Sequence, residues 1–576
     1  MNFDYIIVGA GSAGCVLANR LSENENNKVA IIEAGDSSDI WKVKMPLALL
    51  YTMHDPKYNW KYYSEPEPYL NNRRVFCPRG KMIGGCSSHN GMVFVRGNKD
   101  DYSRWEGFGL KNWSYEKVLP YFKKLETWSE GESQYRGSLG PMPINQSKNS
   151  NPLFKAFINA AGQAGHRTNI DMNGKEQEGF GMFDTTMHEG ERAGVAKYYL
   201  NPVLKRKNLT VFKNSFVEKI LFEGKKAIGF QVKIKGKLEK IYASKEVILS
   251  GGSINSPQLL MLSGIGDANH LKNKGIDVVN DVKGVGKNLH DHLETYIQQE
   301  CKTPNSLYTY TKLIPKVLAG IQWFLFKSGP CSKSFLEAGG FAKSSPERKI
   351  ANIQFHFFPS FVINHGLEDP KTHGYQLHAS PNHPKSRGHI TLNSSDPYDY
   401  PKILFNYLKE EEDLIQTREC IHVARKILSQ PALIEHAGNE VGPGSNAQSD
   451  DELDDYIRSK ADTAYHPCGT CKMGVDEMAV VDESLKVKGI QNLRVVDASI
   501  IPEIPKLQTR NTRNQINKFS DTALFSYYWQ GIWVPLKQFM SPTNFLTISN
   551  MKFRTIRHLM SSSFDIKLIN NSKLHV

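Results

Sequence analysis

The sequence predicts an α/β fold in which a Rossmann-like dinucleotide-binding domain is connected to a second domain. Three observations support this fold class. Residues 3–33 follow the order strand, glycine turn, helix, strand and acidic residue. Residues 247–266 repeat the order strand, glycine turn and helix. At 576 residues the chain also exceeds the size of one ordinary hydrophobic core, so two intimately connected domains are expected.

The first motif has glycines at G-x-G-x-x-G spacing directly after an apolar strand at 3–8. A helix at 15–21 and a strand at 29–32 follow, and an acidic residue ends that strand. The glycines allow a tight turn, close approach of a pyrophosphate and close packing of helix on strand. The helix N-terminus attracts phosphate, and the acid accepts from a ribose hydroxyl. The motif does not separate FAD from NAD. The predicted contacts are Gly9, Gly11, Ser12, Gly14 and Glu33.

Two further segments are candidates for cofactor contact. Residues 77–98 contain a Gly-Gly turn among small polar groups, which can direct backbone N–H groups toward a phosphate or a cofactor ring. The segment 492–502 contains a buried-type strand that ends in Asp497, whose carboxylate can bond a cofactor hydroxyl. The predicted contacts are Gly84, Gly85, Ser87, Asn90 and Asp497, together with Val217 in the strand-like segment 209–222.

Other segments are assigned by composition and periodicity. Residues 132–152 are rich in Gly, Ser, Pro and Asn, which predicts a surface connection between domains. In 250–266 a helix is expected with Pro257 near its start. Residues 374–406 predict strands with turns in a sheet on the substrate side, and 410–428 predict an amphipathic helix.

Charge and cysteine usage limit the partners and the compartment. The net charge is +13, but residues 506–576 hold ten Lys/Arg and two Asp, which leaves +5 for the rest, so no nucleic acid partner is predicted. There is no run of 18 apolar residues, the first strand begins too early for a signal peptide, and the eight cysteines have no disulfide-scaffold density. A cytoplasmic protein is expected, with peripheral association at the inner membrane left open.

Metal and redox motifs are weak. The His-Asp-His run at 290–292 has no matching Cys or His cluster after it, so no metal site is predicted. Cys468 and Cys471 have C-x-x-C spacing, but neither a second pair nor a thioredoxin-like helix start accompanies them.

Taken together and in order, these segments resemble the glucose–methanol–choline (GMC) oxidoreductases over roughly residues 1–505. The resemblance implies FAD as the cofactor. It also implies an FAD domain built from separated segments and a substrate domain with an antiparallel sheet and helices. We expect the FAD domain at 1–150, 206–300 and 461–505, the substrate domain at 151–205 and 301–460, and an atypical tail at 506–576, disordered or altered in sequence.

His89, in GGCSSHNG, resembles the histidine that choline oxidases attach covalently to the flavin ring. Such a bond would raise the flavin potential and favour hydride acceptance. The alternative is a loop histidine that makes one hydrogen bond. We therefore expect His89 to contact FAD, with a covalent bond as the stronger form of this prediction.

The predicted active site follows from the same resemblance. His466 precedes a proline, has an unperturbed pKa of about 6.5 and matches the catalytic histidine of the family. His356, on an apolar strand, resembles a second active-site histidine that helps to hold the alkoxide; a buried core histidine is the alternative. Glu337 lies in an apolar setting, where a quaternary ammonium substrate would offset the cost of burying its charge.

The chain departs from the family pattern after Pro505. The family has a G-N-x-N segment and an Ala-rich helix there, whereas Arg510 stands where an active-site Asn is expected. Our hypothesis is a change of reading frame or another sequence alteration near residue 506, and an intact G-N-x-N in another frame of the gene would support it. Alternatively, Trp529, Trp533 and the basic residues of the tail bind a membrane surface.

The leading functional prediction is FAD-dependent oxidation of choline to betaine aldehyde, a step of glycine betaine synthesis, with electrons passing to a quinone chain or another acceptor. Three alternatives stay open: a dehydrogenase for another aliphatic alcohol, a choline oxidase that uses dioxygen, and an inactive flavin-binding protein caused by the altered tail. A homodimer is also left open.

Overall fold

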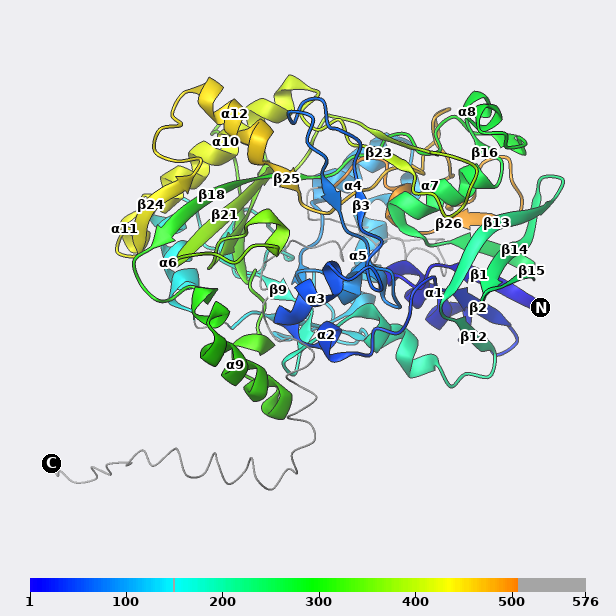
Figure 1. Ribbon diagram of the computed structural model, residues 1–576, viewed down its shortest axis with the longest axis horizontal. Helices are drawn as coiled ribbons and strands as arrows, with labels where there is room; N and C mark the ends of the chain where they lie inside the picture. The colour runs from blue at the N-terminus through cyan, green and yellow to red at the C-terminus, as the bar shows by residue number, and fades with distance from the viewer. Residues whose placement is uncertain (149–150, 506–576) are drawn as a thin grey trace.

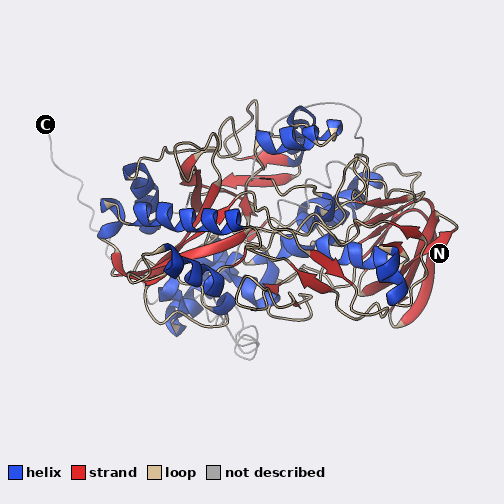
Figure 2. Ribbon diagram, turned by 90° about the horizontal axis from the view of Figure 1, so that it is seen from above, coloured by secondary structure: helices blue, strands red, loops and turns tan. Residues whose placement is uncertain are grey.

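The computed structural model describes residues 1–148 and 151–505. Two large sheets occupy opposite halves of the molecule, one beside the N-terminus and the other beneath α10 and α12 (Figures 1 and 2). The N- and C-terminal parts of the described chain meet in the first half, because β26 (Leu493–Val495) pairs with β15 (Lys237–Leu249). The predicted α/β class is confirmed.

The first sheet is mainly parallel and buried. β1 pairs in parallel with β2 and β15, β12 adds to β2, and β13 and β14 extend the sheet as an antiparallel ribbon. The aligned register places the carboxyl ends of β1, β2, β15 and β26 at one edge, where such sheets bind ligands. Its other strands are β1 (Asn2–Val8), β2 (Val29–Ile32), β12 (Leu209–Phe212), β13 (Ser215–Glu223) and β14 (Lys226–Ile234).

Two helices begin at this edge, each after a glycine turn. They are α1 (Ser12–Leu21) and α7 (Gly252–Leu262), and nearly all of their residues are buried. Pro257 lies inside α7 rather than near its start, which corrects the sequence expectation. The shift arises because the helix already begins at Gly252, directly after the turn.

The second sheet is antiparallel throughout. Its strand order is β24-β18-β21-β20-β19-β8, with β25 paired to β18. Helices α10 and α6 pack against it. The strands are β8 (Gly179–Met182), β18 (Leu293–Cys301), β19 (Ala338–Ala342), β20 (Ile353–Phe358), β21 (Gly374–Pro381), β24 (Ala437–Gly442) and β25 (Asp462–Thr463); the helices are α6 (Pro152–Gln163), α10 (Glu411–Leu428) and α12 (Asp450–Lys460).

The prediction for residues 374–428 is confirmed in part. β21 joins the second sheet, and α10 is the expected helix. β22 (His389–Thr391) and β23 (Lys402–Leu404) instead form a separate two-stranded sheet. A turn-rich segment separates β21 from this pair.

The segment 132–152 is not simply a surface connection. It contains β7 (Met142–Gln146), which belongs to a small sheet with β5 (Val93–Phe94), β6 (Glu126–Trp128) and β9 (Asp184–Thr185). Met142 and Ile144 are fully buried on one face of β7. Their alternation with Pro143 and Asn145 is a strand pattern that the polar composition of the segment concealed.

The remaining described helices are shorter or peripheral. No described helix is long and apolar enough to cross a membrane. The boundaries predicted between the FAD domain and the substrate domain stay a prediction. The remaining α-helices are α2 (Trp41–Lys44), α3 (Leu50–Met53), α4 (Lys99–Gly107), α5 (Tyr115–Leu125), α8 (Ala268–Asn273), α9 (Leu313–Phe326) and α11 (Pro431–Ile434), and the site uses one 3₁₀ turn, η2 (Gly85–Ser88).

Candidate functional site

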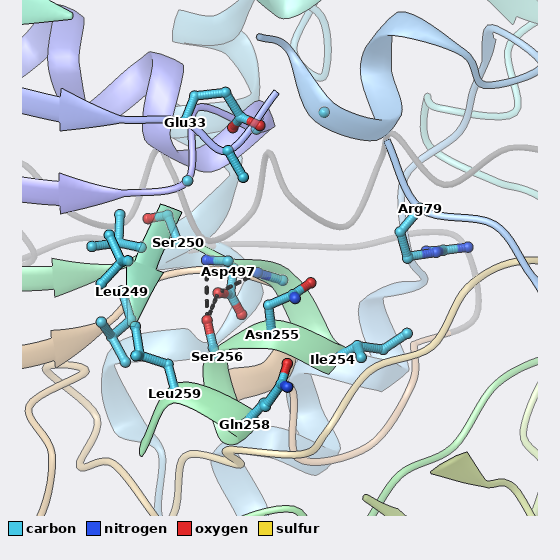
Figure 3. A pocket seen from close by; sticks show the side chains of 18 of the residues that line it. Glu33, Arg79, Leu249, Ser250, Ile254, Asn255, Ser256, Gln258, Leu259 and Asp497 are labelled. Carbon is cyan, nitrogen blue, oxygen red and sulfur yellow. Dashed lines mark hydrogen bonds between the residues drawn. The ribbon is translucent and has the colours of Figure 1, made fainter. Parts of the chain in front are cut away.

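A pocket with about 1170 Å³ of space, part of it open to solvent, lies at the carboxyl edge of the parallel sheet (Figure 3). The turn before α1 and the turn before α7 form its walls, and η2 closes one side. Neither helix has a side-chain cap at its first turn. Backbone N–H groups at the N-terminus of α1 are therefore available to an anionic ligand, whereas the N–H of Gly252, the first residue of α7, donates to the Asp497 carboxylate.

The glycine motif has the steric role that its spacing predicts. A Cβ on Gly14 would lie 1.9 Å from the Gly9 carbonyl oxygen, and a Cβ on Gly9, whose φ is +93°, would lie 2.4 Å from Ser250 O. Gly11 differs, because the nearest atom to its Cβ position is the Gly85 Cα at 4.0 Å. Gly11 thus leaves open space toward the pocket, and it brings two predicted cofactor loops together.

Two buried carboxylates line the pocket. Glu33 accepts hydrogen bonds from the backbone N–H groups of Ala10 (2.9 Å) and Gly35 (2.8 Å). Asp497 accepts from Gly252 N (2.8 Å) and from the Ser256 hydroxyl (2.6 Å). Burial raises the pKa of both acids, while these hydrogen bonds lower it. Each carboxylate is therefore held in a fixed position, where it can also accept from a ribose or ribityl hydroxyl.

Most predicted cofactor contacts line this pocket, but some lie behind it. The residues that line it are Gly9, Gly11, Ser12, Glu33, Gly85, Val217 and Asp497, whereas Gly14, Gly84, Ser87, His89 and Asn90 do not. Ser87 holds the turn by donating to Gly84 O (2.7 Å), and Asn90 accepts from Arg192 (2.6 Å). These two residues support the loop rather than face the pocket.

Sequence reasoning missed several residues that line the pocket. They are Trp60, Arg79, Phe216, Asn255, Gln258 and Pro397. None of these residues is part of the glycine turns from which the cofactor contacts were predicted. Asn255 and Gln258 come closest, because they follow the second glycine turn. Phe216 could have been predicted from its neighbour, because it directly precedes Val217, which was predicted to contact the cofactor.

The pocket fits a flavin dinucleotide. The uncapped N-terminus of α1 suits the pyrophosphate, two fixed carboxylates suit hydroxyl groups, and the open space at Gly11 allows close approach of the backbone. The aromatic rings of Trp60 and Phe216 add an apolar surface for a ring system.

His89 directly follows η2 and is almost fully buried, with 5% of its surface exposed. Its Nδ1 atom is buried and has no hydrogen-bond partner within the described residues. Burial, together with the positive charges of the nearby Arg79 and Arg192, lowers the pKa of His89 to about 3. The imidazole is therefore neutral near pH 7, with a ring nitrogen that no described protein group occupies.

His466 and His292 form a buried pair. Their Nδ1 atoms lie 3.1 Å apart, and His292 Nε2 lies 3.1 Å from the Asn382 carbonyl oxygen. That oxygen can only accept, so His292 Nε2 carries the proton and its Nδ1 accepts from His466 Nδ1. Burial lowers the pKa of His292 to about 4 and of His466 well below 6.5, so both are neutral. The unprotonated nitrogen of His466 is then Nε2, the atom that a general base needs.

His356 lies on β20 in a second buried cluster. The Gln354 side-chain nitrogen lies 2.9 Å from His356 Nε2, and His356 Nδ1 lies 3.7 Å from Glu294. The other oxygen of Glu294 accepts from His378 Nδ1 at 3.0 Å. Burial, together with His378 and His292, lowers the pKa of His356 well below 6.5. Both ring nitrogens of His356 face protein groups, so it polarises the site rather than presenting a free base.

Glu337 directly precedes β19 and is 1% exposed. The Ser147 hydroxyl donates to its Oε2 atom. Gly339, two residues farther along the strand, pairs with His356. The sheet register therefore places a buried carboxylate close to the histidine-bearing strand.

The His-Asp-His run has a structural explanation. Asp291 accepts from His466 N (2.6 Å), Tyr407 Oη (2.6 Å) and the Thr463 hydroxyl, and so holds the segment that carries His466. No group of three potential metal ligands occurs in residues 1–148 and 151–505. Cys468 and Cys471 are buried free thiols. Arg510, predicted to lie at the active site, falls outside the described residues.

Comparison with known proteins places this site in context. Family models described as GMC oxidoreductase match residues 3–294 and 384–513. A mitochondrial choline dehydrogenase of Mus musculus is 46% identical over 511 residues, 87% of this chain and 86% of the relative. An oxygen-dependent choline dehydrogenase of Sinorhizobium fredii is 47% identical over 506 residues, 88% and 92% of the two chains.

Solved structures agree in fold. Pyridoxine 4-oxidase from Mesorbium loti has a TM-score of 0.81 at 28% identity and covers 92% of this chain and 99% of its own. A structure concerned with FAD modification in formate oxidase of Aspergillus oryzae RIB40 has a TM-score of 0.83 at 27% identity, with 92% and 97% covered. The pocket, the antiparallel second sheet and these matches give one conclusion: the chain belongs to the GMC oxidoreductases, a family of FAD enzymes.

Proposed function

We propose that this protein oxidises choline to betaine aldehyde. The observation that carries the proposal is the buried carboxylate of Glu337 beside the histidine-bearing strand of the second sheet. The mouse and Sinorhizobium relatives that are named choline dehydrogenase support it. In an apolar sheet, such a carboxylate selects a cationic alcohol over a neutral one.

Glu337 would bind the quaternary ammonium group. This group has a positive charge but no N–H donor, so recognition depends on charge and shape rather than on hydrogen bonds. Ser147 holds one oxygen of Glu337 and fixes the carboxylate. Substrate charge and carboxylate then compensate each other in a site from which water is excluded.

His466 would take the hydroxyl proton at Nε2. The contact with His292 orients its ring, and the backbone N–H of His466 is tied to Asp291. The proton that His466 gains would be shared with His292 through their Nδ1 contact. His356 and its partners polarise the space where the alkoxide forms.

The cofactor would be held by the glycine turns at Gly9–Gly11 and 250–252 and by the carboxylates of Glu33 and Asp497. The chemistry that FAD supplies is acceptance of a hydride from the carbinol carbon. We further propose that the flavin is attached covalently to His89. The buried His89 Nδ1 atom, which has no hydrogen-bond partner within the described residues, supports this part of the proposal.

We propose a quinone chain or dioxygen as the electron acceptor, and the names of the bacterial relatives favour testing dioxygen first. Peroxide formed in step with choline consumption would identify an oxidase. Turnover that requires a quinone or a dye would identify a dehydrogenase.

The test is anaerobic addition of choline while the oxidised-flavin absorbance is followed. Bleaching supports the proposal; bleaching that is equal with choline and with its neutral carbon isostere, 3,3-dimethylbutan-1-ol, supports a dehydrogenase for aliphatic alcohols instead. Glu337→Gln should keep its flavin and lose about 10²-fold in kcat/KM for choline, but less than tenfold for the isostere. The exposed Glu347→Gln is the matched control. A flavin that stays oxidised with both alcohols would contradict the proposal.

A further inference from the structure

Three neighbouring strands of the second sheet carry a buried polar cluster. His356 on β20 lies opposite His378 on β21, and β18 pairs with the other edge of β21 (Figure 1). Residues two apart on a strand share a face, so Gln376 and His378 project from the same side of β21. Both are at most 1% exposed, as is Glu294 on β18. Because water does not reach them, their polar groups depend on one another for hydrogen bonds.

The side-chain amide of Gln376 has one orientation that suits its neighbours. Its Oε1 atom accepts from the backbone N–H of Val362 at 2.8 Å and from Gln298 Nε2 at 2.9 Å. Since a backbone N–H can only donate, the amide atom that faces it is the oxygen. The amide nitrogen of Gln376 then faces His378 Nε2 and donates to it.

This hydrogen bond fixes the proton of His378. Its Nε2 accepts, so the proton of the neutral ring lies on Nδ1, which donates to Glu294 Oε2 at 3.0 Å. The second oxygen of Glu294 lies 3.7 Å from His356 Nδ1. A second proton on His378 would lie on Nε2 and would point at the N–H groups of Gln376. The amide therefore opposes protonation of this histidine.

The charge of the cluster depends on that proton. Burial raises the pKa of Tyr296 and, together with His378 and His292, lowers the pKa of His356, so both of these groups are neutral. A protonated His378 would cancel the negative charge of Glu294. The ionisable groups that surround His378 and Glu294 are Tyr296 on β18, His356 on β20, Asp462 on β25, His365 beside Asp462, and Tyr465.

We propose that Gln376 is a positioning residue that keeps His378 neutral and so preserves a negative charge beside the active-site histidines. It acts through His378 and Glu294 rather than on the substrate. A negative cluster favours a cationic alcohol and a protonated His466. The kinetic consequence rests on the proposed function, whereas the proton positions are a property of the protein alone.

The first measurement is ¹⁵N NMR of the full-length holoprotein, labelled at its histidine ring nitrogens and without alcohol. The signals of His378 are those that disappear in His378→Asn. Wild type should show one protonated and one bare nitrogen from about pH 8 to about pH 6, the range in which histidines ordinarily titrate. Gln376→Met keeps the length of the side chain but removes the donor, so His378 should gain a second proton in this range.

The matched control is Gln299→Met. Gln299 lies on the adjacent strand β18, and its side chain donates to Gly438 O at 2.8 Å, away from the histidines. His378 should keep its single proton in this variant. Flavin absorbance of each variant checks that it is folded.

Steady-state kinetics with choline test the consequence for the reaction. Gln376→Met should match wild type at about pH 8 and have about tenfold lower kcat/KM at about pH 6, because a protonated His378 repels the substrate cation. Adding His378→Asn to Gln376→Met should remove this extra ionisation from the pH profile, since the group that titrates is gone.

Several outcomes would overturn the proposal. A wild-type His378 with its proton on Nε2, or one that takes up a second proton in this range, contradicts the assignment without any change at Gln376. A His378 that stays neutral in Gln376→Met shows that the amide is not what holds it neutral. An extra ionisation that persists in the double variant belongs to another group. Wild type that does not oxidise choline would contradict the proposed function instead, and the NMR result would still decide the role of Gln376.

Discussion

His292 Nδ1 lies 3.1 Å from His466 Nδ1, and the Asn382 carbonyl fixes the direction of the proton between them. His292 is thereby a positioning residue, because it acts on the reaction through the tautomer of His466. His292→Asn keeps an acceptor atom near the position of Nδ1, whereas His292→Ala removes it. We expect His292→Ala to lower kcat/KM for choline by about 10²-fold and His292→Asn to recover most of that loss.

The measurement is steady-state kinetics over a pH series, with flavin content determined for each variant. If both variants lose activity equally while they keep their flavin, His292 is only a packing residue.

Glu294 joins two histidines of the neighbouring cluster. Its carboxylate accepts from His378 Nδ1 at 3.0 Å and lies 3.7 Å from His356 Nδ1. Glu294→Gln removes this negative charge, so the field at the site becomes less favourable to a protonated His466. We expect kcat/KM to fall by about tenfold and the KM for choline to change less than kcat. An unchanged kcat would show that the cluster serves packing alone.

The glycine turns could be predicted from the sequence because their steric causes are local. Position 14 requires glycine because any Cβ there would clash with the carbonyl oxygen of Gly9, five residues earlier. The contact between His292 and His466 spans 174 residues, so no local pattern indicates it. His292 instead belonged to the His-Asp-His run, for which no metal site and no other role was predicted, and only the fold shows Asp291 holding the His466 backbone. Trp60 and Phe216 were missed for the same reason, since the pocket is assembled from distant segments.

Gly14→Ala tests the cofactor turn. The added methyl group would lie 1.9 Å from the Gly9 carbonyl oxygen, and backbone atoms cannot move away cheaply. We expect a purified protein with much less flavin and lower stability. Gly162→Ala is the control, because a Cβ at Gly162, in α6, meets nothing within 4 Å. Flavin absorbance relative to protein absorbance measures the effect, and equal flavin in both variants would contradict it.

The pH dependence of stability follows from the burial of His292. Its pKa is about 4 in the folded state against about 6.5 when unfolded, so the unfolded chain binds the extra proton in this window. The folded state therefore has its full stability above about pH 6.5 and loses stability as the pH falls toward 4. Buried acids with raised pKa values, such as Asp291 at about 6, act in the opposite direction, but they are common to wild type and variant.

The difference between wild type and His292→Asn isolates this effect. Between about pH 7.5 and about pH 5, wild type should lose about 2 kcal/mol more unfolding free energy than the variant. Urea unfolding followed by tryptophan fluorescence measures it. A parallel loss in both proteins would mean that His292 is already protonated in the folded state at pH 5.

His89 provides the last test, because its buried Nδ1 has no hydrogen-bond partner within the described residues. A covalent bond from the imidazole to the flavin ring would occupy that atom and remove its capacity to titrate. We expect acid precipitation of wild type to leave the yellow flavin in the pellet and that of His89→Ala to release it into solution. Trp60→Ala, which changes a residue that lines the pocket without offering a nucleophile, should weaken flavin binding but leave the retained flavin in the pellet. Flavin that is released from wild type under the same conditions would show that His89 forms no covalent bond to the cofactor, and the raised flavin potential expected from such a bond would no longer be predicted.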